Sequence, residues 1–238
     1  MANNSTISSN QETYHNRKIA IQWNIRGFRG ALSELQMLLS EGEHLPLVLA
    51  LQETLMNSNS INSLQNTLQG NYIFHHKLGP ITNKGGVCIA ILRGIPHIKI
   101  NISTTIQISA ARLNGPQKIT MASIYIPPTF HNDNLKQELE NVIKQLPRPF
   151  ILMGDYNANH TIWGSKKSDR RGKIILELIG DNNLIILNEQ QQTRFDPRYG
   201  TTSAIDHSIE TINDAIITAA KISIPRTSGK PGHKSVPW

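Results

Sequence analysis

The chain has 238 residues, of which 38% are hydrophobic, and 24 Lys and Arg residues against 17 Asp and Glu give it a net charge of +7. A chain of this length can bury roughly 70% of its unfolded surface, so we expect one large domain with a full core. The basic excess suits a polyanionic partner such as nucleic acid. The single cysteine, Cys88 in the apolar run GGVCIAIL, excludes a disulfide framework and a cysteine-rich zinc site and argues against a disulfide-linked partner.

No apolar run approaches the ~18 residues that a membrane-spanning helix needs, so we expect no membrane partner. The N-terminal stretch MANNSTISSNQETYHN is polar and lacks the apolar segment of a secretory signal. We expect residues 1–17 to be a disordered leader and the protein to be intracellular.

Strand and helix patterns mix without strict alternation between residues 18 and 209, and no internal repeat divides this region. Such a mixture favours an α/β (α+β) fold with a two-layered sheet and helices outside it. The remaining stretch, 210–238, starts with a helix-like pattern and ends in a Pro-, Gly- and Ser-rich connector. Strands are predicted at 18–24, 46–54, 71–77, 85–94, 97–103, 105–113, 118–128, 149–157, 184–188 and 203–209, and helices at 31–41, 58–69, 131–146 and 171–183.

Several predicted buried strands end at a polar residue: Asn24, Glu53, Asp155 with Asn157, and Asp206. A carboxylate at the end of a buried strand costs desolvation energy unless it is paired or bound to a cation. Carboxylates gathered at one sheet edge would repel each other, and a hard divalent cation such as Mg²⁺ would relieve that repulsion. Histidines 75, 76 and 160 have no further ligands at the spacing of a zinc site, so we interpret them as solvated or turn residues.

The segment MGDYNANH is the most informative of these strand ends. Asp155 and Asn157 flank Tyr156, so both point to the same face where the strand ends. Such a pair can hold a water molecule and hydrogen-bond the phosphoryl oxygen that the water attacks. An Asx-rich turn is the alternative, because Asn and Asp initiate turns readily.

The order of seven motifs resembles that of the endonuclease/exonuclease/phosphatase superfamily. Within it, GDYNANHTIWGS followed by RG and NLIILN is similar to the apurinic-type endonuclease domain of arthropod non-LTR retrotransposons. The resemblance covers residues 18–209 and implies a four-layered α/β/β/α sandwich of two packed mixed sheets. The motifs are QWNIRGF, LALQET, GGVCIAI, SIYIPP, LMGDYNANHTIWGS, RRGKIILELI and SAIDHSI.

The resemblance implies a role for each matching residue. Asn24 would support the metal and phosphate site and be a metal ligand itself, and Glu53 would be the principal ligand of Mg²⁺ or Mn²⁺. Tyr125 would contact the scissile phosphate. Asp155 would position or deprotonate the attacking water, and Asn157 would hold the phosphate.

A second group of residues consists of candidates for contacts with the substrate. Thr193 falls where related elements carry a threonine near the site. Arg112 and Lys84 are candidates for backbone phosphates, with solvated surface charges as the alternative. Trp163 and Phe195 are expected to pack, and wedging against DNA is the alternative.

In the family, the residue matching Asp206 orients a catalytic histidine from a later Ser-Asp-His motif. No residues after Asp206 read Ser-Asp-His in this sequence. We therefore expect an incomplete C-terminal part of the fold, produced by an internal deletion, a frameshift or a mis-spliced gene. On a strand, neighbours point to opposite faces, so the adjacent His207 is not expected to be the partner of Asp206.

Three functions remain open. The first is a Mg²⁺-dependent, nuclear endonuclease domain that nicks DNA to expose a 3′-hydroxyl primer, joined to a reverse transcriptase in the full-length element. The second is a catalytically impaired remnant that at most binds DNA. The third, a phosphoesterase for small molecules or lipids, is disfavoured by the pattern NANHTIWGS followed by RG.

Overall fold

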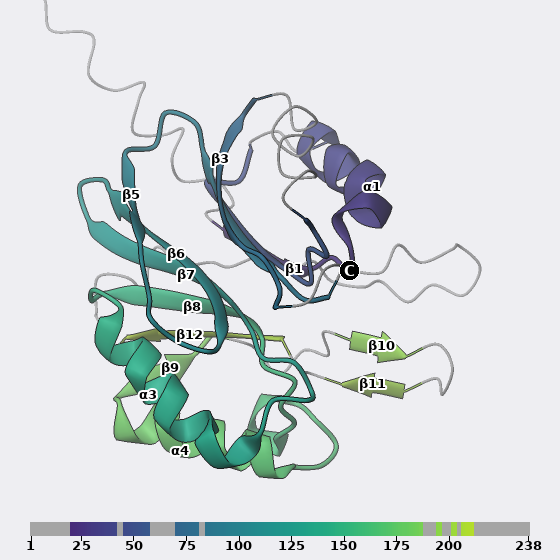
Figure 1. The fold of residues 1–238 in the computed structure, drawn as a ribbon, viewed down its shortest axis with the longest axis vertical. Coiled ribbons are helices and arrows are strands. Elements are labelled where there is room, and N and C mark those ends of the chain that lie inside the picture. Colours follow the sequence, from purple (N-terminus) through teal and green to yellow (C-terminus); the bar gives the residue numbers. More distant parts are fainter. Residues whose placement is uncertain are drawn as a thin grey trace, which may run out of the picture.

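The computed structural model describes residues 20–41, 45–57, 70–80, 84–187, 194–196, 201–203 and 206–211. Two mixed β-sheets pack face to face, and helices cover the outer face of each sheet (Figure 1). The predicted α/β/β/α layering is therefore confirmed.

The smaller sheet has the strand order β1-β2-β4-β3. Strands β1 and β2 are parallel, and the other pairs are antiparallel. Helix α1 (Phe28–Glu41) connects the parallel pair and covers the outer face, where Phe28 and Leu35 pack against Trp23 and Leu51. The strands span Ala20–Asn24 (β1), Val48–Gln52 (β2), Tyr72–Lys77 (β3) and Val87–Leu92 (β4).

The larger sheet has the order β5-β6-β7-β8-β12-β9. Strands β7 and β8 are parallel and the remaining pairs are antiparallel. A separate hairpin joins β10 (Arg194–Asp196) to β11 (Thr201–Ser203). The strands of the sheet span His97–Ile100 (β5), Gln107–Asn114 (β6), Lys118–Tyr125 (β7), Phe150–Asp155 (β8), Leu184–Ile186 (β9) and Asp206–Thr211 (β12).

The space between the sheets is filled by apolar side chains that alternate along the central strands. In β8, Ile151 and Met153 face this layer. By the same alternation, Asp155 lies on this face at the end of the strand. Complete burial of one large apolar side chain contributes roughly 1.5–3 kcal/mol to folding. The layer consists of Ala20, Val48, Ala50, Ile89, Ile91, Ala111, Leu113, Met121, Ile151 and Met153.

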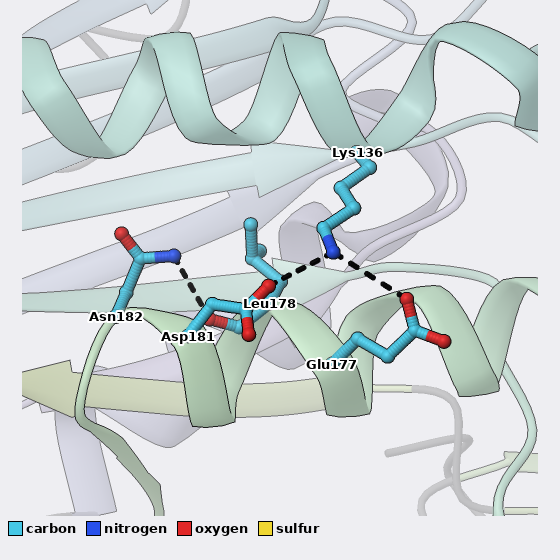
Figure 2. Close-up of polar contacts among 5 residues, drawn as sticks. All are labelled: Lys136, Glu177, Leu178, Asp181 and Asn182. Carbon is cyan, nitrogen blue, oxygen red and sulfur yellow. Dashed lines mark hydrogen bonds and ion pairs between the residues drawn. The ribbon is translucent and has the colours of Figure 1, made fainter.

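Helices α3 (Leu135–Gln145) and α4 (Arg170–Asp181) cover the outer face of the larger sheet. Lys136 of α3 lies 2.8 Å from Asp181 and 3.5 Å from Glu177 of α4, as Figure 2 shows. The hydrogen bond to Asp181 raises the pKa of Lys136. Because these side chains are largely exposed, the ion pairs add little to stability, and the apolar contacts beneath them hold the helices.

The edge strands β3 and β5 meet through a pair of histidines. The Nε2 atoms of His75 and His97 are 2.9 Å apart, and Nδ1 of His97 lies 2.8 Å from the carbonyl of Ile95. Burial, followed by the charges of His97 and Lys99, lowers the pKa of His75. This pair of rings therefore connects the edges of the two sheets.

Arg171, at the start of α4, organises the loop that follows β7. The side chain is 5% exposed, and its guanidinium donates to the side chain of Asn132 in the short helix η2 (Asn132–Asn134) at 3.1 Å. A buried guanidinium supplies donors to backbone carbonyls that water cannot reach. The accepting carbonyls are those of Ile126, Pro127, Pro128, Phe130 and Tyr156, at 2.9–3.4 Å.

Most predicted elements are present within the described residues. The strand pattern of 118–128 corresponds to β7, and the helix pattern of 171–183 corresponds to α4. The hairpin of β10 and β11 was not anticipated. The helix expected at 58–69, the leader and the tail lie outside the described residues. In the described part of the chain, no helix is both long and apolar enough for a membrane crossing.

We predict that Arg171→Met lowers the free energy of unfolding by about 3 kcal/mol or more, because buried acceptors that lose their donor cost ~1–3 kcal/mol each. Urea unfolding of the purified chain measures this loss. Arg170→Met is the matched control, since Arg170 is exposed and pairs with the exposed Asp133. Equal losses in the two variants would contradict the assigned role of Arg171.

Candidate active site

Polar residues occupy one register row at the end of the larger sheet. Gln107 of β6 pairs with Tyr125 of β7, which pairs with Asp155 of β8. Asp206 of β12 lies opposite Asp155, and His207 lies opposite Gly154. The two central strands end at this row, so it forms one rim of the space between the sheets.

Asn24 joins this row to the smaller sheet. Its amide nitrogen donates to Glu53 Oε1 at 2.8 Å and to Asp155 Oδ2 at 2.7 Å. The distance between Glu53 Oε1 and Asp155 Oδ2 is therefore no larger than the sum of these two hydrogen-bond lengths. Because Glu53 follows β2 and Asp155 ends β8, a single amide connects carboxylates from different sheets. Hydrogen bonds to charged acceptors are about twice as strong as neutral ones.

Tyr125 lies beside the same carboxylates. Its ring is 7% exposed, and its hydroxyl is hydrogen-bonded to Glu53. Burial, followed by the negative charges of Glu53 and Asp155, raises the pKa of Tyr125. The phenol therefore stays protonated at neutral pH and serves as a hydrogen-bond donor.

Asp155 and Asn157 are held by one compact turn. Asp155 is 1% exposed, and its Oδ1 accepts from the backbone N–H of Asn157 at 2.9 Å. The amide nitrogen of Asn157 donates to the carbonyl of Ile126 at 3.1 Å, next to Tyr125. The Asx turn that was the alternative for this segment is therefore present, and it orients the two polar side chains.

Two site residues have left-handed backbones. The φ angle is +49° at Glu53 and +48° at Asn157. Asparagine tolerates this conformation, whereas glutamate adopts it at a cost, and such residues concentrate at functional sites. The backbone around Glu53 is fixed by N–H groups of Thr54 and Leu55, which donate to the carbonyls of Gly86 and Gly85.

Residues behind the site support it and were not identified from the sequence. Gln52 is fully buried and donates to Ser123 Oγ across the two sheets at 2.9 Å. Gln107 accepts from the backbone N–H of Gly86, whose own carbonyl fixes Thr54. At Gly154, a Cβ atom would lie 1.9 Å from the carbonyl oxygen of Ile124, so only glycine allows β7 and β8 to approach there. Among these supporting residues, only Gln52 belongs to a motif singled out in the sequence, LALQET.

Arg112 lies outside this cluster. Its guanidinium donates to Thr120 Oγ1 and to the carbonyl of Pro147, both at 3.0 Å, and to the carbonyl of Arg148. It is five residues along β6 from Gln107, which is roughly 17 Å on a strand. The guanidinium thus closes the loop before β8, and a contact between Arg112 and a backbone phosphate stays a prediction from the sequence.

The other candidates are placed as follows. Lys84 is exposed beside the Gly85–Gly86 turn, near the rim of the site. Trp163 is 1% exposed, which confirms the expectation that it packs. Thr193 lies outside the described residues, and the structure describes only the backbone of Phe195.

The donor set of the cluster is made of oxygen atoms. Glu53 and Asp155 bring two carboxylates together, which suits a hard divalent cation better than zinc. Among the described side chains, no group of three His, Cys, Asp or Glu residues gathers as a metal centre. The site thus offers charged acceptors, one protonated phenol and amide donors, which are the groups that hydrolysis of a phosphate ester requires.

Comparisons with known proteins find similar sequences in mobile elements. A protein family described as endonuclease-reverse transcriptase matches residues 119–233. The RNA-directed DNA polymerase from the mobile element jockey of Drosophila melanogaster is 29% identical over 79% of this chain. A probable RNA-directed DNA polymerase from the Drosophila melanogaster transposon X-element is 28% identical over 47%. The chain spans a fifth or less of the length of these relatives.

Solved structures share the fold. The endonuclease domain of TRAS1, a telomere-specific non-LTR retrotransposon, superposes with a TM-score of 0.66 at 22% identity, over 83% of this chain and 86% of that one. An AP endonuclease from Leishmania major gives a TM-score of 0.63 at 14% identity, covering 80% and 78% of the two chains. Together with the family match and the jockey relative, these shared folds support an endonuclease domain of the endonuclease/exonuclease/phosphatase superfamily, similar to those of non-LTR retrotransposons.

Proposed function

We propose that this chain is a divalent-metal-dependent endonuclease domain that nicks DNA. The observation that supports it most is the amide of Asn24, which holds the carboxylates of Glu53 and Asp155 together beside a protonated Tyr125. Two anionic groups brought together at the rim of a buried layer are costly unless they serve a cation or a reaction.

Glu53 is the proposed principal ligand of Mg²⁺ or Mn²⁺, with Asp155 close to it. A cation bound there would neutralise negative charge on the phosphate as the transition state forms. Asn24 was expected to be a ligand as well as a support. Because its amide nitrogen faces both carboxylates, its geometry favours a positioning role over ligation.

Asp155 is the proposed acceptor of the proton of the attacking water. As the water oxygen bonds to phosphorus, the bond to the 3′-oxygen breaks, and that oxygen takes a proton from solvent and leaves as the 3′-hydroxyl. A positioned general base contributes about 10²- to 10⁴-fold to such a step. The hydrogen bond from the backbone of Asn157 orients this carboxylate.

The remaining polar groups would bind the phosphate. The Tyr125 hydroxyl and the Asn157 amide are donors that can stabilise charge developing on its oxygens. Asp206 lies at the register position opposite Asp155, which supports its proposed place in the catalytic site. A contact between Thr193 and the substrate remains a proposal from the sequence alone.

DNA is the proposed substrate, in the nucleus, and a reverse transcriptase is the proposed neighbour in the full-length element. The net charge of +7 favours a polyanion. The relatives from jockey and the X-element are RNA-directed DNA polymerases, and a nicked strand supplies the 3′-hydroxyl that a polymerase extends.

The second candidate is an impaired domain that binds DNA without cutting it efficiently. The observation that favours it is the lack of a Ser-Asp-His motif in these 238 residues. Losing a histidine that stabilises the phosphate would slow the reaction by ~10³-fold or more. A rate of plasmid nicking equal to that of a site variant, with salt-sensitive DNA binding retained, would favour this candidate.

We predict that Asp155→Asn slows the Mg²⁺-dependent nicking of supercoiled plasmid by ~10²-fold or more, because the general base is lost. The rate at which the open circular form appears measures this effect. Asp181→Asn is the matched control, since Asp181 is exposed and pairs with Lys136 on the outer helices. The proposal fails if the wild-type chain nicks no faster than Asp155→Asn.

We predict that Glu53→Gln abolishes the binding of Mn²⁺ measured by titration calorimetry without DNA, because the principal carboxylate is lost. Glu177→Gln, on the exposed surface of α4, should bind Mn²⁺ like the wild type. Since this measurement needs no catalysis, it tests the metal site even in an impaired enzyme. Unchanged Mn²⁺ binding by Glu53→Gln would refute the assignment.

A further inference from the structure

An exposed apolar residue lies on the short helix η3 (Thr161–Trp163), directly after the turn that carries Asp155 and Asn157. Ile162 is 49% exposed, whereas its neighbour Trp163 is 1% exposed. The next charged residues, Lys166 and Lys167, are also exposed. We define Thr161, Ile162, Lys166 and Lys167 as the η3 surface.

Hydrogen bonds hold the backbone of the η3 surface in place. The indole of Trp163 donates to the carbonyl of Ala158 at 3.2 Å, so η3 folds back onto the catalytic turn. His160 Nδ1 accepts from the backbone N–H of Ile162, and the carbonyl of His160 accepts from Ser165. A ligand that contacts Ile162 therefore meets a side chain whose backbone is already ordered, which lowers the entropy cost of binding.

A second anchor fixes the far side of the same loop. Asp169 accepts from the backbone and side-chain amides of Asn159 at 3.0 and 2.9 Å, and from Gly172 at the start of α4. The loop is thus tied at both ends to the turn and to α4. Its apolar residue nevertheless points into solvent, although Trp163 next to it is fully packed.

Position and charge together identify the partner. Ile162 is five residues from Asn157, so at full extension it lies within ~17 Å of that residue, or about five base-pair steps of DNA. The two lysines that follow add positive charge within the same loop. Isolated surface apolar residues are common, but one beside cations and near a phosphodiester site fits a wedge against DNA bases.

We propose that the η3 surface binds duplex DNA next to the nicking position, with Ile162 inserted against a base step and Lys166 and Lys167 on flanking phosphates. This inference rests on the proposed function and extends it to how the duplex is held. The surface unstacks bases beside the scissile phosphate, which favours steps that deform easily. The wedge is Ile162, and Trp163, which the sequence offered for that role, is its buried support.

The test uses the whole chain and a fluorescein-labelled 25-base-pair duplex in EDTA, so that binding is separated from cutting. Ile162→Ser should weaken binding about 5- to 10-fold, as expected when a half-buried isoleucine contact is lost. It should also abolish the fluorescence rise of 2-aminopurine placed near the nick site. Ile98→Ser is the matched control, because Ile98 is 53% exposed on β5 and pairs with Arg112, away from the site.

The lysines are tested by the salt dependence of the same binding. Lys166→Gln combined with Lys167→Gln should reduce the slope of log affinity against log salt by about 1–2. Lys99→Gln combined with Lys118→Gln is the control, since both residues are exposed, on β5 and at the start of β7, away from the site. Thermal unfolding of all variants should stay close to that of the wild type.

The outcomes separate this inference from the proposed function. If the wild-type chain fails to bind duplex DNA, both fall. If the wild type binds and Ile162→Ser binds equally well, only the η3 surface is refuted. If Ile162→Ser changes self-association in sedimentation but leaves DNA affinity unchanged, the surface belongs to a protein contact and the inference is overturned.

Discussion

The amide of Asn24 is the interaction on which the site depends. It donates to Glu53 after the smaller sheet and to Asp155 at the end of the larger one, at 2.8 and 2.7 Å. Without a donor between them, two carboxylates at this separation repel each other in a poorly solvated place. The side chain of Asn24 therefore both connects the two sheets at this rim and holds the two carboxylates of the proposed site.

The rest of the fold positions the groups around this amide. Parallel pairing of β7 with β8 places Tyr125 beside Asp155, and Gly154 allows the close approach of the two strands. Arg171 holds the loop that leaves Tyr125, and its guanidinium donates to buried carbonyls and to Asn132. The side chains proposed for catalysis are thus oriented by strand ends and by a buried guanidinium, which is the preorganisation that charge-stabilising sites require.

The sequence predicted the strand-end residues well, because their signal is local. Asn24, Glu53 and Asp155 each follow an apolar run, and the structure brings them together with Tyr125, which only the family resemblance had indicated. The supporting residues could not be predicted in the same way. The partner of Gln52 is 71 positions away, and the acceptors of Arg171 lie up to 45 positions away, so their roles exist only once the chain has folded.

Two features show what the sequence leaves undetermined. The charge of Arg112 suggested a phosphate ligand, but the sequence could not indicate that its guanidinium closes the loop before β8. The left-handed backbone of Glu53 had no counterpart in the sequence, because a glutamate gives no local sign of positive φ.

The most direct test of the joined site is a comparison of Asn24→Ala with the wild-type chain in Mg²⁺-dependent plasmid nicking, with both proteins shown to be folded by circular dichroism. We predict that Asn24→Ala nicks at least ~100-fold more slowly, because its carboxylates lose the amide that orients them. Equal rates of nicking in the two proteins would contradict the account.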